Sequence, residues 1–111
     1  MIDVGLRKAV TTLTWEELRR ASKIHPPFVD MHQGYGVIKE EIEECDEAMT
    51  IIKAHLDGLW RCTRVDDLGV FKGVAIAIKK CAIELALEAI QVAAVAEKLI
   101  NVYSAEEKQQ E

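Results

Sequence analysis

Apolar side chains recur through the middle of this chain at alternating steps of three and four residues, a spacing that places them on one face of an α-helix. The pattern continues for about seven turns, which is long for a helix in a small protein. Its members are Tyr35, Ile38, Ile42, Cys45, Met49, Ile52, Leu56 and Leu59. A seam of this length must face a partner helix, and that requirement limits the folds that the chain can adopt.

A second long segment, from about Leu68 to Tyr103, is apolar around nearly its whole circumference, as expected of a helix buried by several neighbours. Half of all residues are hydrophobic and only 5% are aromatic, and the abundance of alanine, leucine, isoleucine and glutamate favours helices. We therefore predict an all-α protein, a helical bundle of two long antiparallel helices plus shorter ones. Because both long helices have apolar faces wider than an antiparallel pair can cover, we expect a homodimer or higher homo-oligomer to complete the core.

A first, shorter helix is signalled by Thr14 followed three residues later by Glu17, the spacing of a capping box. It should end before the run His25-Pro26-Pro27, because the two prolines force an extended linker. The long central helix should then begin near Met31, where Asp30 offers a second cap.

The central helix is expected to end near Asp57, since Gly58 and the polar stretch 61–67 indicate a connection. Asp66 or Asp67 would cap the next helix. Gly69 and Gly73 allow a short leading helix to split from the last one.

The length of 111 residues predicts a single domain, residues 1–111, with its core over about residues 28–103 and a polar, frayed tail over 104–111. A formal charge of −5 argues against binding to nucleic-acid polymers, which depends on lysine and arginine neutralising phosphate. The start of the chain does not resemble a signal peptide, and polar residues interrupt its most apolar stretch, so we expect a soluble, cytoplasmic protein that does not enter membranes. Three widely spaced cysteines indicate neither a disulfide framework nor a zinc site.

Two glutamates lie on a side of the central helix that is otherwise small and apolar. Glu41 and Glu44 share a stripe with Gly34, Val37, Ala48 and Ile51. Burying two like charges one turn apart is unfavourable unless a cation neutralises them. A second polar stripe, on the last helix, consists of Glu84, Glu88 and Gln91.

If the two stripes face each other, their oxygen atoms form a site suited to Mg²⁺, or to Mn²⁺, both of which prefer hard ligands. Such an ion would polarise phosphoryl oxygens and acidify an attacking water. The alternative is that both stripes are solvated surface, which is the usual place for charge on helices.

At these residues the sequence resembles the MazG-like branch of the all-α nucleoside triphosphate pyrophosphohydrolases. The run Glu40-Glu41-Ile42-Glu43-Glu44 fits the family's first motif, two adjacent glutamates with a third three residues on, and the segment 88–96 is similar to its second. The resemblance covers about residues 28–100. It implies an oligomeric helical bundle that holds Mg²⁺ through Glu41, Glu44, Glu88 and residue 91, and that hydrolyses a nucleoside triphosphate to monophosphate and pyrophosphate.

Two departures from the family pattern bear on this expectation. Gln91 stands where the motif has aspartate, although its carbonyl oxygen can still coordinate and Glu84 could supply the missing charge. The gap between the motifs is longer than usual, which implies an inserted segment around residues 56–71. An alternative function is therefore a non-catalytic helical oligomerisation or nucleotide-binding module with a degenerate metal site.

The remaining candidates concern the substrate and the proton chemistry. Without a covalent intermediate, a carboxylate such as Glu40 or Glu44 would orient or deprotonate the attacking water. The side chains assigned to binding a nucleoside triphosphate are Lys80, Arg61, Arg64 and Trp60. The histidines, by contrast, are expected to serve mainly in packing and capping.

Overall fold

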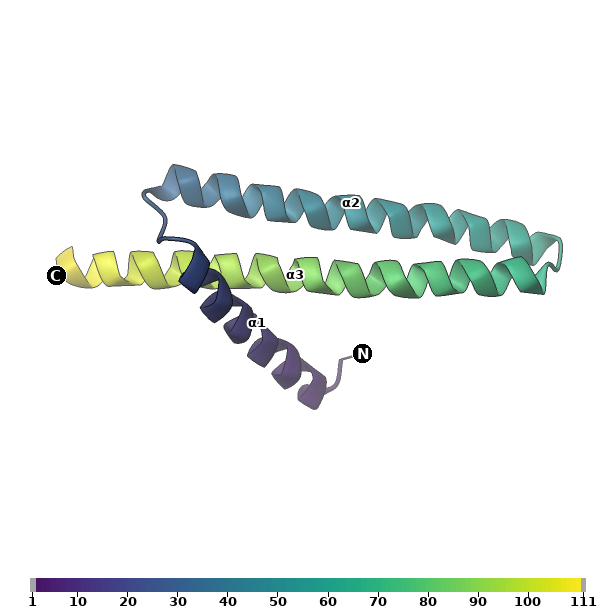
Figure 1. The fold of residues 1–111 in the computed structure, drawn as a ribbon, viewed down its shortest axis with the longest axis horizontal. Coiled ribbons are helices and arrows are strands. Elements are labelled where there is room, and N and C mark those ends of the chain that lie inside the picture. The colour runs from purple at the N-terminus through teal and green to yellow at the C-terminus, as the bar shows by residue number, and fades with distance from the viewer. Residues whose placement is uncertain (1, 111) are drawn as a thin grey trace. The chain divides into compact units, whose positions relative to one another are not determined.

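The computed structural model describes residues 2–110, and it describes their side chains as far as Val102. Three α-helices account for nearly all of this range: α1 (Val4–Ile24), α2 (Met31–Arg64) and α3 (Leu68–Gln110) (Figure 1). Within residues 2–110 there is no β-strand. The prediction of an all-α protein is confirmed.

Helix α1 begins eleven residues earlier than the sequence suggested, at Val4 rather than near Trp15. Asp3 is its N-cap, because its carboxylate accepts hydrogen bonds from the backbone N–H groups of Gly5, at 2.7 Å, and Leu6, at 3.2 Å. The predicted capping box at Thr14 is wrong: Thr14 lies inside the helix, and its hydroxyl donates to the carbonyl of Val10. The predicted end before the two prolines is confirmed.

The start of α2 agrees with the predicted cap. The backbone N–H of Gln33 donates to the Asp30 carboxylate at 2.8 Å, which satisfies one of the unpaired donors of the first turn. The side-chain carbonyl oxygen of Gln33 in turn accepts from the backbone N–H of Val29 at 2.6 Å. The last residues of the linker are therefore tied to the first turn of α2.

Helix α2 continues through Gly58 to Arg64, so its predicted end near Asp57 is wrong. Since a glycine inside a helix costs only about 1 kcal/mol relative to alanine, the packing of the long helix overrides it. The helix ends at a tight turn in which Asp66 has a positive φ of 54°. The N–H of Asp66 donates to the carbonyl of Thr63 and that of Asp67 to Cys62, the pattern of a Schellman motif.

The left-handed backbone at Asp66 makes the turn sensitive to the residue there. Asp66→Gly should raise the free energy of unfolding by about 1 kcal/mol, because glycine has no Cβ to clash in this region. Asp66→Val should lower it by about 1 kcal/mol or more, because a β-branched residue tolerates positive φ poorly. Urea denaturation of both variants measures the difference. Equal stability of the two would mean that the turn does not hold this conformation in solution.

Helix α3 starts at Leu68, with the Asp67 carboxylate accepting from the N–H of Val70. No break occurs at Gly69 or Gly73, so no short leading helix splits off. The helix also runs through the predicted tail as far as Gln110, which is consistent with the good helix formers alanine, glutamate and lysine in that segment. Glu111 lies outside the described residues.

By its internal contacts the chain divides into two compact units, one formed by Glu43–Glu88 and the other by Met1–Ile42 with Ala89–Glu111. The first, the hairpin unit, consists of the second part of α2 and the first part of α3, which lie antiparallel and side by side (Figure 1). Gly58 faces Val74 here, and a Cβ in its place would make an ordinary van der Waals contact with Val74 Cγ1, at 3.6 Å. Near the turn, Cys62 is buried.

In the second unit, the linker unit, the linker and the start of α2 pack against the end of α3. The Lys98 ammonium donates to the carbonyl of Pro26 at 3.0 Å and lies 4.3 Å from the centre of the Phe28 ring. Gly34 is buried against Leu99, and any Cβ at this position would overlap Leu99 Cδ2. These contacts explain why the linker follows a defined path.

Large apolar side chains remain exposed on both long helices. On α2 the predicted seam divides into two rows. Cys45, Ile52 and Leu59 are half-buried in the hairpin unit, whereas Met49 and Leu56 of the same seam are exposed. Among the described residues, none of the three helices has an apolar stretch that could cross a membrane.

Candidate metal centre

Glu44 on α2 and Glu88 on α3 meet across the hairpin unit. A carboxylate oxygen of each lies within 4.8 Å of the other, and a hydrogen bond joins the two groups. That hydrogen bond requires a proton, because two ionised carboxylates can only accept. It raises the pKa of Glu88, and desolvation and the negative charges of Glu44 and Glu84 raise this pKa further.

Glu41 belongs to the linker unit, but α2 is one continuous helix, so Glu41 lies one turn before Glu44. Glu41 is half-buried, whereas the neighbouring Glu40 is exposed. The first predicted motif therefore presents two carboxylates on one side of α2, with Glu40 nearer to solvent.

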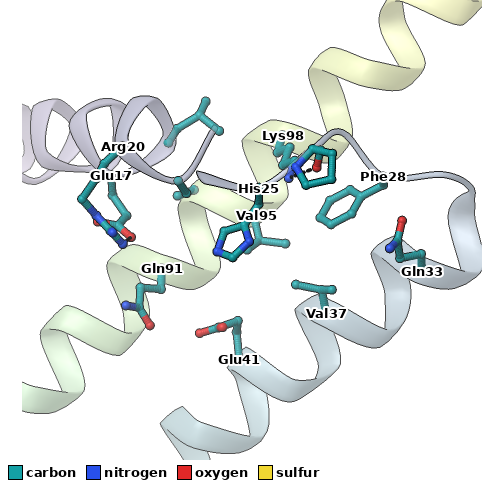
Figure 2. Close-up of a pocket in the computed structure, with 14 residues that line it drawn as sticks. Glu17, Arg20, His25, Phe28, Gln33, Val37, Glu41, Gln91, Val95 and Lys98 are labelled. Carbon is teal, nitrogen blue, oxygen red and sulfur yellow. Dashed lines mark hydrogen bonds and ion pairs between the residues drawn. The ribbon is translucent and has the colours of Figure 1, made fainter. Parts of the chain in front are cut away.

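The linker unit contains a pocket of about 390 Å³ between α1, the start of α2 and the end of α3 (Figure 2). Glu41 and Gln91 lie toward one end of this pocket, and Phe28 and Gln33 toward the other (Figure 2). Gln91 is half-buried. On the continuous helix α3 it follows Glu88 by one turn, as the stripe predicted.

Within the hairpin unit, Glu84 and Lys80 line a second pocket together with Ala48 and Ile51. Glu84 is close enough to Glu88 for its charge to raise the pKa of Glu88. The structure therefore places Glu84 beside the Glu44–Glu88 pair, and Lys80 on the same stretch of α3.

The other predicted substrate residues lie at the far end of α2. Trp60, Arg61 and Arg64 follow Glu44 by sixteen residues or more, which corresponds to about 24 Å or more along the helix axis. Within the hairpin unit the structure does not bring them to the acidic pair. Trp60 is 60% exposed beside the turn.

Several pocket residues were not among the sequence candidates: Arg20, His25, Phe28, Gln33 and Lys98. Arg20 is held in place by Glu17, whose carboxylate accepts from Arg20 Nε at 3.0 Å. The hydrogen bonds from Arg20 lower the pKa of Glu17. The clearest sequence signal near this pocket was the double proline, which forces an extended linker between α1 and α2.

Taken together, the hairpin unit pairs two carboxyl groups from different helices, and the linker unit offers a pocket with both apolar and cationic walls. Oxygen ligands of this kind suit a hard divalent cation, whose charge would offset the repulsion between the carboxylates of Glu44 and Glu88. No known family model, curated protein or solved structure matches this chain.

The raised pKa of Glu88 predicts how the stability of the metal-free protein depends on pH. Because the folded-state pKa lies above the ordinary value of 4.5, the contribution of this group is fully present below pH 4.5 and is lost as the pH rises through the raised value. We therefore expect the melting temperature of the parent to fall over this range relative to that of Glu88→Gln, measured in EDTA.

The comparison with Glu88→Gln also removes the effect of Glu17, which has the opposite sign. The lowered pKa of Glu17 contributes stability that is present above its unfolded value and is lost as the pH falls. Both proteins retain this contribution, so their difference isolates Glu88. A difference that does not change with pH would contradict the raised pKa of Glu88.

Proposed function

We propose that this protein is a Mg²⁺-dependent pyrophosphohydrolase, which hydrolyses a nucleoside triphosphate to a monophosphate and pyrophosphate. The observation that carries the proposal is the hydrogen-bonded pair Glu44–Glu88 on facing helices, with Glu41 one turn away on α2. Two carboxylates brought together on facing helices repel each other, and a divalent cation bound to their oxygen atoms would remove that repulsion. The resemblance of residues 40–44 and 88–96 to the MazG-like motifs supports the same function.

In this proposal Glu41, Glu44 and Glu88 hold Mg²⁺ or Mn²⁺, with Gln91 or Glu84 as a further oxygen ligand. When bound, the ion supplies neutralisation of the phosphoryl oxygens and acidification of water. The glutamates must all be ionised for this purpose, so metal binding competes with the proton on the acidic pair.

The chemistry assigned to the protein's own side chains is proton transfer and orientation. Glu40 or Glu44 accepts a proton from the attacking water as the water oxygen bonds to phosphorus. The bond between the α-phosphorus and its bridging oxygen breaks, and pyrophosphate leaves with the electron pair of that bond. Of the two candidates, Glu40 has no part in the hydrogen bond of the acidic pair.

A second candidate function is a nucleotide-binding or oligomerisation module that does not catalyse hydrolysis. Two observations favour it: position 91 is a neutral glutamine, and the hydrogen bond between Glu44 and Glu88 partly satisfies the acids without a metal. In that case the linker-unit pocket would still bind a nucleotide, but weakly and without turnover.

We also propose that the protein functions as a homodimer or higher homo-oligomer. Large apolar side chains on both long helices are exposed, among them Met49 and Leu56 on α2 and Ile83 and Leu87 on α3. A second copy that covers them would remove this apolar surface from water. The three free cysteines are compatible with work in a reducing compartment, the cytoplasm.

The experiment that tests this function is pyrophosphate release from a panel of ribo- and deoxynucleoside triphosphates, with Mg²⁺ or Mn²⁺ and with Glu41→Gln alongside. We expect release with at least one nucleotide, in equal amount with the monophosphate, and its loss in the variant. If the folded protein released pyrophosphate from none of these nucleotides, the result would favour the non-catalytic module.

A further inference from the structure

The side-chain amide of Gln33, in the lining of the linker-unit pocket, has a fixed orientation. The Oε1 atom of Gln33 accepts the backbone N–H of Val29 at 2.6 Å. An N–H group needs an acceptor, so this contact decides which end of the amide faces the linker. The amide nitrogen must then face the other way, and Figure 2 shows it on the pocket side of Gln33.

The amide nitrogen of Gln33 therefore presents hydrogen-bond donors, and no acceptor, to the pocket. It donates to no other residue in the part of the chain whose side chains are described. Phe28, Val37 and Val95 contribute apolar or aromatic walls, and charged side chains, among them Arg20 and Lys98, line other parts of the pocket. A pocket of about 390 Å³ that combines apolar walls with a few polar groups is of the size and character that binds a small ligand.

The position of Gln33 relative to the acidic residues also fits a nucleotide. Gln33 precedes Glu41 by eight residues on α2, or about 12 Å along the helix axis. Both residues line the same pocket, Gln33 near the linker and Glu41 at the opposite end (Figure 2). A nucleoside lying between them would direct its 5′ phosphates toward Glu41.

We propose that this pocket binds the nucleobase and that Gln33 selects bases with a carbonyl oxygen, such as uracil, guanine and hypoxanthine, over adenine. Adenine has no carbonyl oxygen, and its exocyclic amino group would set donor against donor. This inference rests on the proposed function, because it assumes that the ligand is a nucleotide. It assigns Gln33 as a specificity residue and leaves the hydrolytic step unchanged.

The test uses binding without metal or turnover. Isothermal titration calorimetry in EDTA measures inosine, uridine and adenosine 5′-monophosphates against the parent protein. Inosine and adenosine monophosphates form a matched pair, since both are purine nucleotides and differ in a carbonyl or an amino group at position 6. We expect inosine monophosphate to bind about tenfold more tightly than adenosine monophosphate, the effect of roughly one net hydrogen bond.

The variant Gln33→Glu removes the donors and keeps an oxygen that can accept the N–H of Val29. We therefore expect it to fold, and to reverse or abolish the preference for inosine over adenosine monophosphate. His32→Ala, an exposed neighbour outside the pocket lining, should keep the parental preference. A circular dichroism melt of each variant verifies folding.

The inference is overturned if adenosine monophosphate binds as tightly as inosine monophosphate, if no monophosphate binds, or if Gln33→Glu keeps the parental preference. The proposed hydrolysis fails separately. Base preference without pyrophosphate release would support the pocket assignment and contradict the proposed hydrolysis. Pyrophosphate release without base preference would support the hydrolysis and contradict the pocket assignment.

Discussion

Glu88→Gln should leave the protein at least as stable as the parent without metal at neutral pH, and should reduce pyrophosphate release by about 100-fold or more. Glutamine has nearly the same shape as glutamate and can donate a hydrogen bond to Glu44 without a shared proton. The repulsion between two carboxylates disappears. The cost is the loss of one anionic ligand from the proposed metal site.

Two measurements test the effects of Glu88→Gln on stability and on activity separately. Thermal melts with and without Mg²⁺ should show a stabilising effect of the ion on the parent that is much smaller in Glu88→Gln, because only the parent binds the ion tightly in its folded state. Pyrophosphate release should fall in the same variant.

The matched control is Glu47→Gln, which removes the same charge from an exposed position on α2. It should respond to Mg²⁺ and hydrolyse triphosphate like the parent. If Glu88→Gln also did so, the acidic pair would not be the metal site.

The second large effect is expected at the exposed apolar row of α2. Leu56 is 60% exposed and Met49 is 39% exposed, two turns apart on the same side of the helix. If a second copy covers this row, Leu56→Glu buries an unpaired carboxylate in the interface, which is strongly unfavourable. We expect the dissociation constant of the oligomer to rise by about 100-fold or more.

Sedimentation velocity over a range of concentrations measures this effect directly. The parent should sediment as a dimer or larger species, and Leu56→Glu should shift toward monomer. Thr50→Glu adds the same charge on the polar side of α2 and should not change the distribution. A monomeric parent would contradict the proposed self-association.

The all-α class and the starts of the two long helices, α2 and α3, were predictable because they depend on local sequence patterns. The three-and-four spacing from Tyr35 to Leu59 defines a helix regardless of its partner, and Asp30 caps α2 through a bond to a residue three positions away. The end of α2 was not predictable in the same way. Glycine is a local signal for the end of a helix, but α2 continues through Gly58 to Arg64, because one helical glycine costs only about 1 kcal/mol.

The start of α1 shows a related limit. Thr14 and Glu17 have the spacing of a capping box, but Asp3 provides a cap further upstream and the helix simply continues through Thr14. Spacing alone does not distinguish a cap from a threonine that bonds back to the preceding turn. The sequence did predict a connection between the two long helices around Asp66, but not the positive φ of that residue.

The acidic residues could be named from the sequence because helical spacing places them on common stripes. The sequence did not show whether the two stripes face each other, because the register of α2 against α3 depends on side-chain packing along the whole hairpin. Gln33 and Phe28 were not predicted as site residues, because residues in and next to a linker have no periodic sequence pattern that would reveal a pocket. Their positions follow from the path of the linker, which Lys98 helps to fix.

The central claim is that the Glu44–Glu88 pair binds a divalent cation. Titration of the protein with Mn²⁺, followed by electron paramagnetic resonance of the free ion, tests this most directly. We predict one bound Mn²⁺ per chain, displaced by Mg²⁺ and by lower pH, and absent in Glu44→Gln. No bound Mn²⁺ in the folded parent, or equal binding in Glu44→Gln, would contradict the claim.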